Sequence, residues 1–215
     1  MPRLFPRWSD TAFRLALIGL VIAGTTAIAG PMIFMRTPYN TGQHYSVDQP
    51  VQFDHRHHVK DDGIDCRYCH RDVERSAWAG VPSTDVCMGC HNQVWRDSPM
   101  LEPVRRAWFS GQPIPWNRVH QLPQFVYFDH SVHVNHGIGC VSCHSRVDGM
   151  ALTEQGQPLT MGWCLSCHRS PERNLRPLDK ITDLNWQPPS DPAYGKQLAN
   201  QYGTRKLDHC TACHR

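Results

Sequence analysis

Cys66-Arg-Tyr-Cys69-His70 is the first of five copies of a Cys-x-x-Cys-His frame within the 215 residues, and this repetition indicates the fold. All ten cysteines of the chain belong to this frame, and a histidine directly follows the second cysteine of every copy. We number the copies motif 1 to motif 5 in chain order. The other four are Cys87-Met-Gly-Cys90-His91, Cys140-Val-Ser-Cys143-His144, Cys164-Leu-Ser-Cys167-His168 and Cys210-Thr-Ala-Cys213-His214.

Three common uses of paired cysteines do not explain this pattern. The motifs leave no cysteine over for a structural disulfide. Zinc ribbons close one tetrahedral site from two pairs, and they need no histidine after each pair. A thioredoxin-like redox protein uses a single pair at the start of a helix. The frame is instead that of covalent c-type haem attachment.

The spacing of the motif suits haem attachment physically. If each motif forms a helical turn, both thiols and the histidine share one face, so the thiols meet the porphyrin edge and the imidazole lies under the iron. The sequence therefore predicts five covalently bound haem c groups, with all ten cysteines as thioether donors. The predicted proximal iron ligands are His70, His91, His144, His168 and His214.

An internal repeat nominates four of the second axial ligands. A Phe-x-His-x-x-His frame at residues 53–58 recurs at residues 128–133, upstream of motifs 1 and 3 respectively. Histidines three positions apart on a turn can send their imidazoles to two different irons. We predict the distal ligands of haems 1 to 4, in that order, to be His55, His58, His130 and His133.

The fifth distal ligand has several candidates. We predict His120, with His136 as its competitor. Met150 and Met161 are thioether alternatives, and a methionine ligand raises the reduction potential of its haem.

The composition predicts a mostly irregular fold with short α-helices, of the multihaem cytochrome c type built from class III-like di-haem modules. The chain contains 17 prolines and 15 glycines and shows no long amphipathic pattern. The porphyrins must therefore supply much of the apolar interior. The predicted segments are a cytoplasmic tail (1–14), a transmembrane anchor (15–35), a juxtamembrane segment (36–52), a first di-haem module (53–98), a Pro/Trp-rich connector (99–127), a second di-haem module (128–170) and a C-terminal segment with the fifth haem (171–215).

Residues 15–35 carry no charge, and as a helix they extend about 31 Å, enough to span a bilayer. Arg3, Arg7 and Arg14 precede this run, whereas one arginine follows it directly. The positive-inside rule therefore predicts a single-pass anchor in the cytoplasmic (inner) membrane with the haem domain on the periplasmic face. The alternative is a signal peptide cleaved before Gly30, after a small-x-small sequence.

The formal net charge is +3 at pH 7. Five oxidised haems, each with two propionates and about one positive charge on its core, bring the total to about −2. No lysine/arginine run is long enough to indicate nucleic-acid binding. We therefore expect membrane lipid and other proteins, and no nucleic acid, as partners.

Two further stretches carry a resemblance to a known family. They are Gly111–His130, reading G-Q-P-I-P-W-N-R-V-H-Q-L-P-Q-F-V-Y-F-D-H, and Leu159–Arg169, reading L-T-M-G-W-C-L-S-C-H-R. Together with the anchor and the five motifs, they make the chain resemble the pentahaem cytochrome c subunit of alternative complex III, a bacterial quinol:electron acceptor oxidoreductase.

This resemblance implies an electron-transfer subunit that is not itself an enzyme and has no catalytic residues. It conducts electrons from quinol oxidation to a mono-haem cytochrome c or a terminal oxidase, within a respiratory or photosynthetic complex. The implied partners also include polytopic quinone-binding membrane subunits and a periplasmic iron-sulfur subunit that resembles molybdoenzymes.

Two other classes are alternatives. Membrane-anchored tetrahaem quinol dehydrogenases share the single N-terminal helix, but their first haem follows the helix almost directly and they have four motifs. A catalytic multihaem reductase needs an iron with a vacant position, whereas this chain has histidines to spare.

Overall fold

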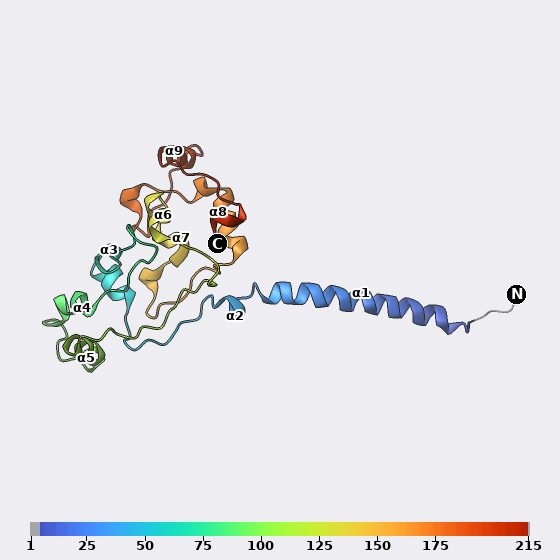
Figure 1. The fold of residues 1–215 in the computed structure, drawn as a ribbon, viewed down its shortest axis with the longest axis horizontal. Coiled ribbons are helices and arrows are strands. Elements are labelled where there is room, and N and C mark those ends of the chain that lie inside the picture. Colours follow the sequence, from blue (N-terminus) through green and yellow to red (C-terminus); the bar gives the residue numbers. More distant parts are fainter. Residues whose placement is uncertain (1–4, 215) are drawn as a thin grey trace. The chain divides into compact units, whose positions relative to one another are not determined.

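The computed structural model describes residues 5–214, which divide into a first unit up to Gly42 and a second unit from Gln43 onward. The first unit contains α1 (Trp8–Phe34), a helix of 27 residues, and the short α2 (Pro38–Thr41) (Figure 1). The predicted tail lies partly outside the described residues, because residues 1–4, including Arg3, are not among them.

Helix α1 contains most of the predicted anchor, but it begins at Trp8 and ends one residue before Met35. In the described part of the chain it is the one helix long and apolar enough to cross a membrane, with a mean hydropathy of 2.0 over its best window and no buried side chain in that window. The Thr25 hydroxyl donates to the Val21 carbonyl at 2.7 Å, which satisfies this polar group within the helix.

The second unit consists of short helices joined by irregular segments (Figure 1). From residue 5 to residue 214 there is no β-strand, and pairing between extended segments is limited to isolated bridges such as Val126 with His214. The predicted fold class is thereby confirmed. The helices of this unit are η1 (Arg56–Asp61), α3 (Cys66–Cys69), α4 (Thr84–His91), η2 (Pro99–Leu101), α5 (Glu102–Ser110), α6 (His130–Asn135), α7 (Cys140–His144), η3 (Val147–Gly149), α8 (Met161–Arg169), η4 (Pro171–Arg173), η5 (Leu178–Lys180), α9 (Tyr194–Gln201) and η6 (Cys210–Ala212).

The apolar core made by side chains is small. Its one described cluster, which we call the α5 cluster, consists of Val51, Val104, Ala107 and Ile114, with Met88 of motif 2 packed against it. Within the described residues no large side chain is completely buried. A unit of this size needs more apolar burial than these side chains supply, so the structure agrees with an interior completed by a cofactor.

The two copies of the repeat fold alike except at one inserted residue. The second copy forms the regular helix α6, whose start is capped by the Asp129 carboxylate accepting from the backbone amides of Ser131 and Val132. The first copy has one residue more before its motif, and there the chain forms the π-helical turn η1. A π-turn is the usual way in which a helix absorbs a single extra residue.

Candidate metal centres

The aromatic residue of each repeat holds the two histidines of its frame in the same arrangement. The Phe53 ring stacks on His58 with centroids 4.4 Å apart and meets the edge of His55 at 4.8 Å. In the second copy the corresponding distances from Phe128 are 4.5 Å to His133 and 4.8 Å to His130. The predicted repeat is therefore also a repeat of side-chain geometry.

Seven of the ten predicted histidine ligands of the five haems place Nδ1 against an oxygen atom. Six of these oxygens are backbone carbonyls, which can only accept, so Nδ1 is the donor in these bonds, and in the neutral ring Nε2 then keeps its lone pair. This is how proteins usually orient a metal-binding histidine. The six carbonyl bonds are His58 to Asp54 (2.9 Å), His70 to Gly80 (2.7 Å), His91 to Val94 (3.0 Å), His130 to Ala77 (2.8 Å), His133 to Asp129 (2.7 Å) and His214 to Phe125 (3.2 Å).

The seventh oxygen belongs to a side chain that sequence analysis missed. The Thr153 hydroxyl lies 3.0 Å from Nδ1 of His55, although 98 positions separate the two residues. Thr153 belongs to the segment between motifs 3 and 4 and lies outside both the motifs and the repeat frame. No signal in the sequence alone pointed to it.

Three predicted distal histidines lie opposite the motif histidines with which they were paired. The ring centroids are 6.1 Å apart for His58 and His91, and 6.0 Å apart for His133 and His168. An iron held between two imidazoles needs about 6 Å between ring centres, since each metal–nitrogen bond is about 2 Å long. These separations therefore have the size that a bis-histidine iron requires.

The third of these facing pairs belongs to motif 3. The rings of His130 and His144 are parallel within 11° with centroids 6.3 Å apart. His55 and His70 are electrostatic neighbours, because a charge on His70 lowers the pKa of His55. The rings of the first and third motif histidines are close as well, since His70 also depresses the pKa of His144.

Burial favours the neutral form of three of these imidazoles. It lowers the pKa of His144 to about 3, with His120 and His130 as the next largest causes. Burial likewise lowers the pKa of His55 to about 4, followed by the effect of His70. The pKa of His133 is also lowered, again mainly by burial. A neutral imidazole is the form that binds a metal.

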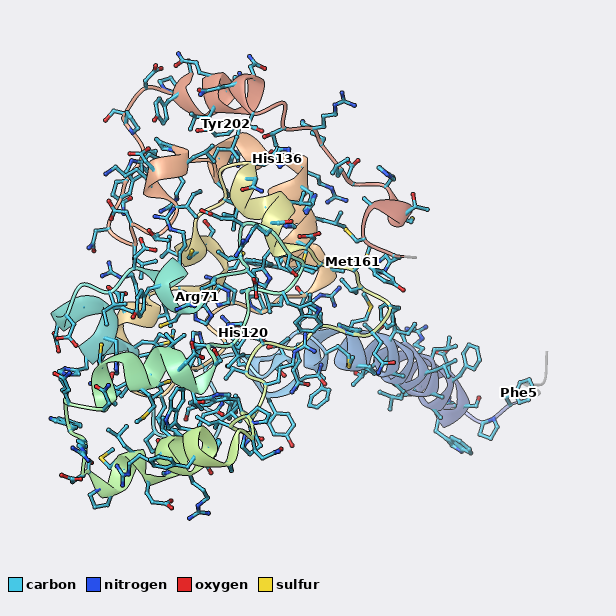
Figure 2. All side chains as sticks on the ribbon, turned by 60° about the vertical axis from the view of Figure 1, so that its left-hand side comes forward. Phe5, Arg71, His120, His136, Met161 and Tyr202 are labelled. Atoms are coloured by element: carbon cyan, nitrogen blue, oxygen red, sulfur yellow. The ribbon has the colours of Figure 1, made fainter. Side chains whose placement is uncertain are left out.

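The two histidines predicted to compete for the fifth distal position lie in different parts of the second unit (Figure 2). The ring of His120 packs edge-on against His144 with centroids 4.4 Å apart, too close for an iron between them, and its Nε2 is buried without a hydrogen-bond partner. His136 ends α6, with its Nδ1 2.7 Å from the Val132 carbonyl. The fifth motif histidine, His214, packs on Phe125 at 5.7 Å. His120 thus accompanies motif 3, and the partner of His214 stays a prediction.

The thiols meet the requirement for thioether attachment. All ten cysteines are free. Motifs 2 to 4 lie in α-helical turns, motif 1 begins in the turn α3, which ends at Cys69, and motif 5 begins in the tighter turn η6, so each motif begins in a helical turn. Burial raises the pKa of Cys143 to about 12. A hydrogen bond with Cys140, together with burial, raises the pKa of Cys66.

The described residues contain no group of three or more His, Cys, Asp and Glu side chains arranged to hold a bare metal ion. The donor sets are instead pairs of imidazoles beside pairs of free thiols. This donor set fits haem c, which brings its own four nitrogen ligands, accepts two axial ligands such as imidazoles, and forms two thioether bonds.

Comparison with known proteins agrees with this chemistry. Residues 56–215 match the protein family described as outer membrane cytochrome MtrC/MtrF-like, domains II/IV. The chain is also similar to the "Menaquinone reductase, multiheme cytochrome c subunit" of Nitratidesulfovibrio vulgaris, with 35% identity over 102 residues. That alignment covers 45% of this chain and 46% of the relative, so the chain spans less than half the length of the relative it matches. Because the family match extends over the whole haem-motif region, the chain belongs to the MtrC/MtrF-like family of multihaem c-type cytochromes, which bind haem c covalently and take part in electron transfer.

Proposed function

We propose that the chain binds five haem c groups, each between two axial ligands. The proximal ligands are the motif histidines named above, and the ten cysteines form the thioether bonds. The distal ligands of haems 1 to 4 are His55, His58, His130 and His133. The observation that carries this assignment is the facing of imidazole rings at 6.0–6.3 Å for motifs 2, 3 and 4. The oriented Nδ1 atoms support it independently.

The assigned residues support electron transfer without substrate chemistry. When bound, each haem supplies one reversible electron at its iron. At haems 1 to 4 the proposed histidines would occupy both axial positions and leave none for a substrate, and the Nδ1 hydrogen bonds of most of these histidines hold their rings in place. We therefore infer an electron-transfer subunit rather than an enzyme.

We further infer that α1 anchors the chain in the cytoplasmic membrane, with the haem-binding unit on the periplasmic side. Its length, its apolar composition and the excess of arginines before it support this orientation. One helix cannot by itself enclose a quinone, so a quinone site must belong to other membrane subunits.

The complex that fits best is a quinol:electron acceptor oxidoreductase of the alternative complex III type. There the chain would conduct electrons from quinol oxidation to a mono-haem cytochrome c or a terminal oxidase, beside polytopic membrane subunits and an iron-sulfur subunit. The relative from Nitratidesulfovibrio vulgaris supports a quinone-linked complex by its name.

That same name favours a second candidate, in which electrons run toward menaquinone instead of away from quinol. Bis-histidine irons conduct in both directions, so this chain alone does not set the direction. Reduction experiments on membranes that contain the complex distinguish the two directions of electron flow. Reduction of the haems by added quinol, in the absence of other donors, supports the first candidate. Reduction only by a periplasmic donor, followed by menaquinone reduction, supports the second.

The haem assignment is tested on the protein purified from its own membranes. Mass spectrometry of the intact chain should show five haem additions, and electron paramagnetic resonance (EPR) should show only low-spin ferric signals. Fewer additions would refute the count. A stoichiometric high-spin signal that disappears on adding nitrite or hydroxylamine would refute the saturated irons and favour a catalytic reductase.

A further inference from the structure

The five motifs do not follow one another in space as they do along the chain. Motif 2 lies beside motif 1, because the thiol of Cys69 is within electrostatic reach of Cys87 and Cys90. The packing of the two motifs agrees with this, since a side-chain carbon added at Gly89 of motif 2 would lie 3.9 Å from the Tyr68 hydroxyl of motif 1. Motifs 1 and 2 are thus in contact.

Motif 1 also contacts motif 3, which is not its neighbour in sequence. The thiols of Cys66 and Cys140 are neighbours, because each is the largest single influence on the pKa of the other. One short segment binds both helix starts: the Thr182 hydroxyl donates to the Asp65 carboxylate at 2.7 Å, and the adjacent Ile181 carbonyl accepts from the Cys140 amide at 3.1 Å. A thioether sulfur is two bonds from the porphyrin ring, so touching sulfurs bring two porphyrin edges together.

Motif 3 in turn lies beside motif 4. The Cys143 thiol is within electrostatic reach of Cys164 and Cys167. In addition, helix α6 supplies a facing histidine to each of the two motifs, at 6.3 Å for motif 3 and 6.0 Å for motif 4. One rigid turn therefore links these two centres.

Motif 5 lies beside motif 4. The Cys164 thiol is within electrostatic reach of Cys213, and the C-terminal segment is drawn beside α8 in Figure 1. The backbone amide of Tyr127 donates to the Cys213 carbonyl at 2.9 Å, which fixes motif 5 to the segment leading into α6.

We propose that the haems form a single row in the order 2–1–3–4–5, so that motifs 2 and 5 are its two ends. Figure 1 shows α4, α3, α7 and α8 following one another across the second unit in this order, with the C-terminus beside α8. The exposure of the cysteines independently supports motifs 2 and 5 as the two ends of the row. Of the ten cysteines only Cys90 of motif 2 and Cys210 of motif 5 are exposed, whereas the other eight are half-buried.

The order has a consequence for partners. The two di-haem modules meet through their first motifs, and their second motifs point away from each other. Electron donor and acceptor proteins therefore contact the chain near motif 2 and near motif 5, and motif 1 is internal. An order that follows the sequence would instead make motif 1 an end and motif 2 internal.

This inference rests on the proposed ligands, and the experiment separates the two. His58→Ala opens the iron of motif 2 and His55→Ala opens that of motif 1, each in the full-length protein. The high-spin ferric iron so produced broadens the EPR signals of its immediate neighbours. We expect one broadened low-spin signal for His58→Ala and two for His55→Ala. His57→Ala is the matched control, because this histidine stacks on Trp95 at 6.1 Å and should produce no high-spin signal.

The outcomes are distinct. Two broadened signals for His58→Ala and one for His55→Ala overturn the proposed order. The absence of a high-spin signal in both variants overturns the ligand assignment instead. If either variant fails to accumulate, anomalous diffraction at the iron edge from crystals of the wild-type holoprotein locates all five irons. The order is refuted if the iron of motif 1 does not lie between those of motifs 2 and 3.

Discussion

Replacing Thr153 by valine should change the reduction potential of one haem and leave the others unaltered. Its hydroxyl is the one side-chain oxygen among the seven that face the Nδ1 atoms of predicted ligands, at 3.0 Å from His55. With Nε2 of His55 on the iron, Nδ1 carries the proton and donates to this hydroxyl. Valine has nearly the same shape and accepts no hydrogen bond, so the substitution removes the bond and little else.

The direction of the change in reduction potential follows from the charge of the iron. A ferric iron withdraws electron density from the imidazole and makes its Nδ1–H a stronger donor, so the bond stabilises the oxidised state more than the reduced state. A neutral hydrogen bond contributes about 0.5–1.5 kcal/mol net, and a difference of about 0.5–1 kcal/mol between oxidation states corresponds to roughly 20–40 mV for one electron. The potential of haem 1 in Thr153→Val should therefore rise by this amount.

Spectroelectrochemical titration of the purified protein measures the effect as the displacement of one of five one-electron steps. Thr204→Val is the matched control, because the Thr204 hydroxyl is buried without a hydrogen-bond partner and its loss should leave all five steps in place. An unchanged titration for Thr153→Val, or a fall in potential, would show that Thr153 does not hold an iron ligand.

Three further predictions concern stability. Gly139→Ala should lower the free energy of unfolding by about 1–3 kcal/mol, because the new methyl group meets the side chain of Arg176, which is only 6% exposed. Guanidinium titrations measure this loss, and Gly149→Ala, with open space around the new methyl group, is the control. Ile114→Ala removes a member of the α5 cluster and should cost about 2–4 kcal/mol, seen as faster hydrogen exchange in α4 and α5. Partial burial raises the pKa of Asp65, but hydrogen bonds outweigh burial and lower this pKa from 3.8 to about 2. The ionised Asp65 therefore stabilises the fold above pH 3.8, and this stabilisation is lost as the pH falls toward 2. Urea titrations across this pH range should show the loss in the wild-type protein and not in Asp65→Asn.

The local parts of the site were predictable from the sequence because local spacing fixes them. The Cys-x-x-Cys-His frame is five residues long and spans little more than one helical turn. The repeated Phe-x-His-x-x-His frame places two imidazoles against one phenylalanine ring. The Nδ1 bonds of His58 and His133 reach carbonyls four residues earlier, which is also a property of the local turn. These features needed no knowledge of the rest of the chain.

The long-range parts were not predictable, because they depend on which irregular segments pass one another. No pattern marks Thr153 as the neighbour of His55, or Cys140 as the neighbour of Cys66. The prediction for His120 shows the same limit. Its position in the connector left its partner open, and the structure places it against His144 of motif 3.

The long-range Nδ1 bonds show why ligand geometry and tertiary structure are inseparable here. His55 bonds to Thr153 of the second module, and His130 bonds to the Ala77 carbonyl of the first. Each module thus holds a proposed iron ligand of the other in place. With so few buried side chains, these bonds and the covalently attached porphyrins must contribute most of what joins the modules. Loss of the haems at the central motifs 1 and 3 should therefore separate the modules, whereas loss at motif 2 or motif 5 should leave the junction between the modules intact.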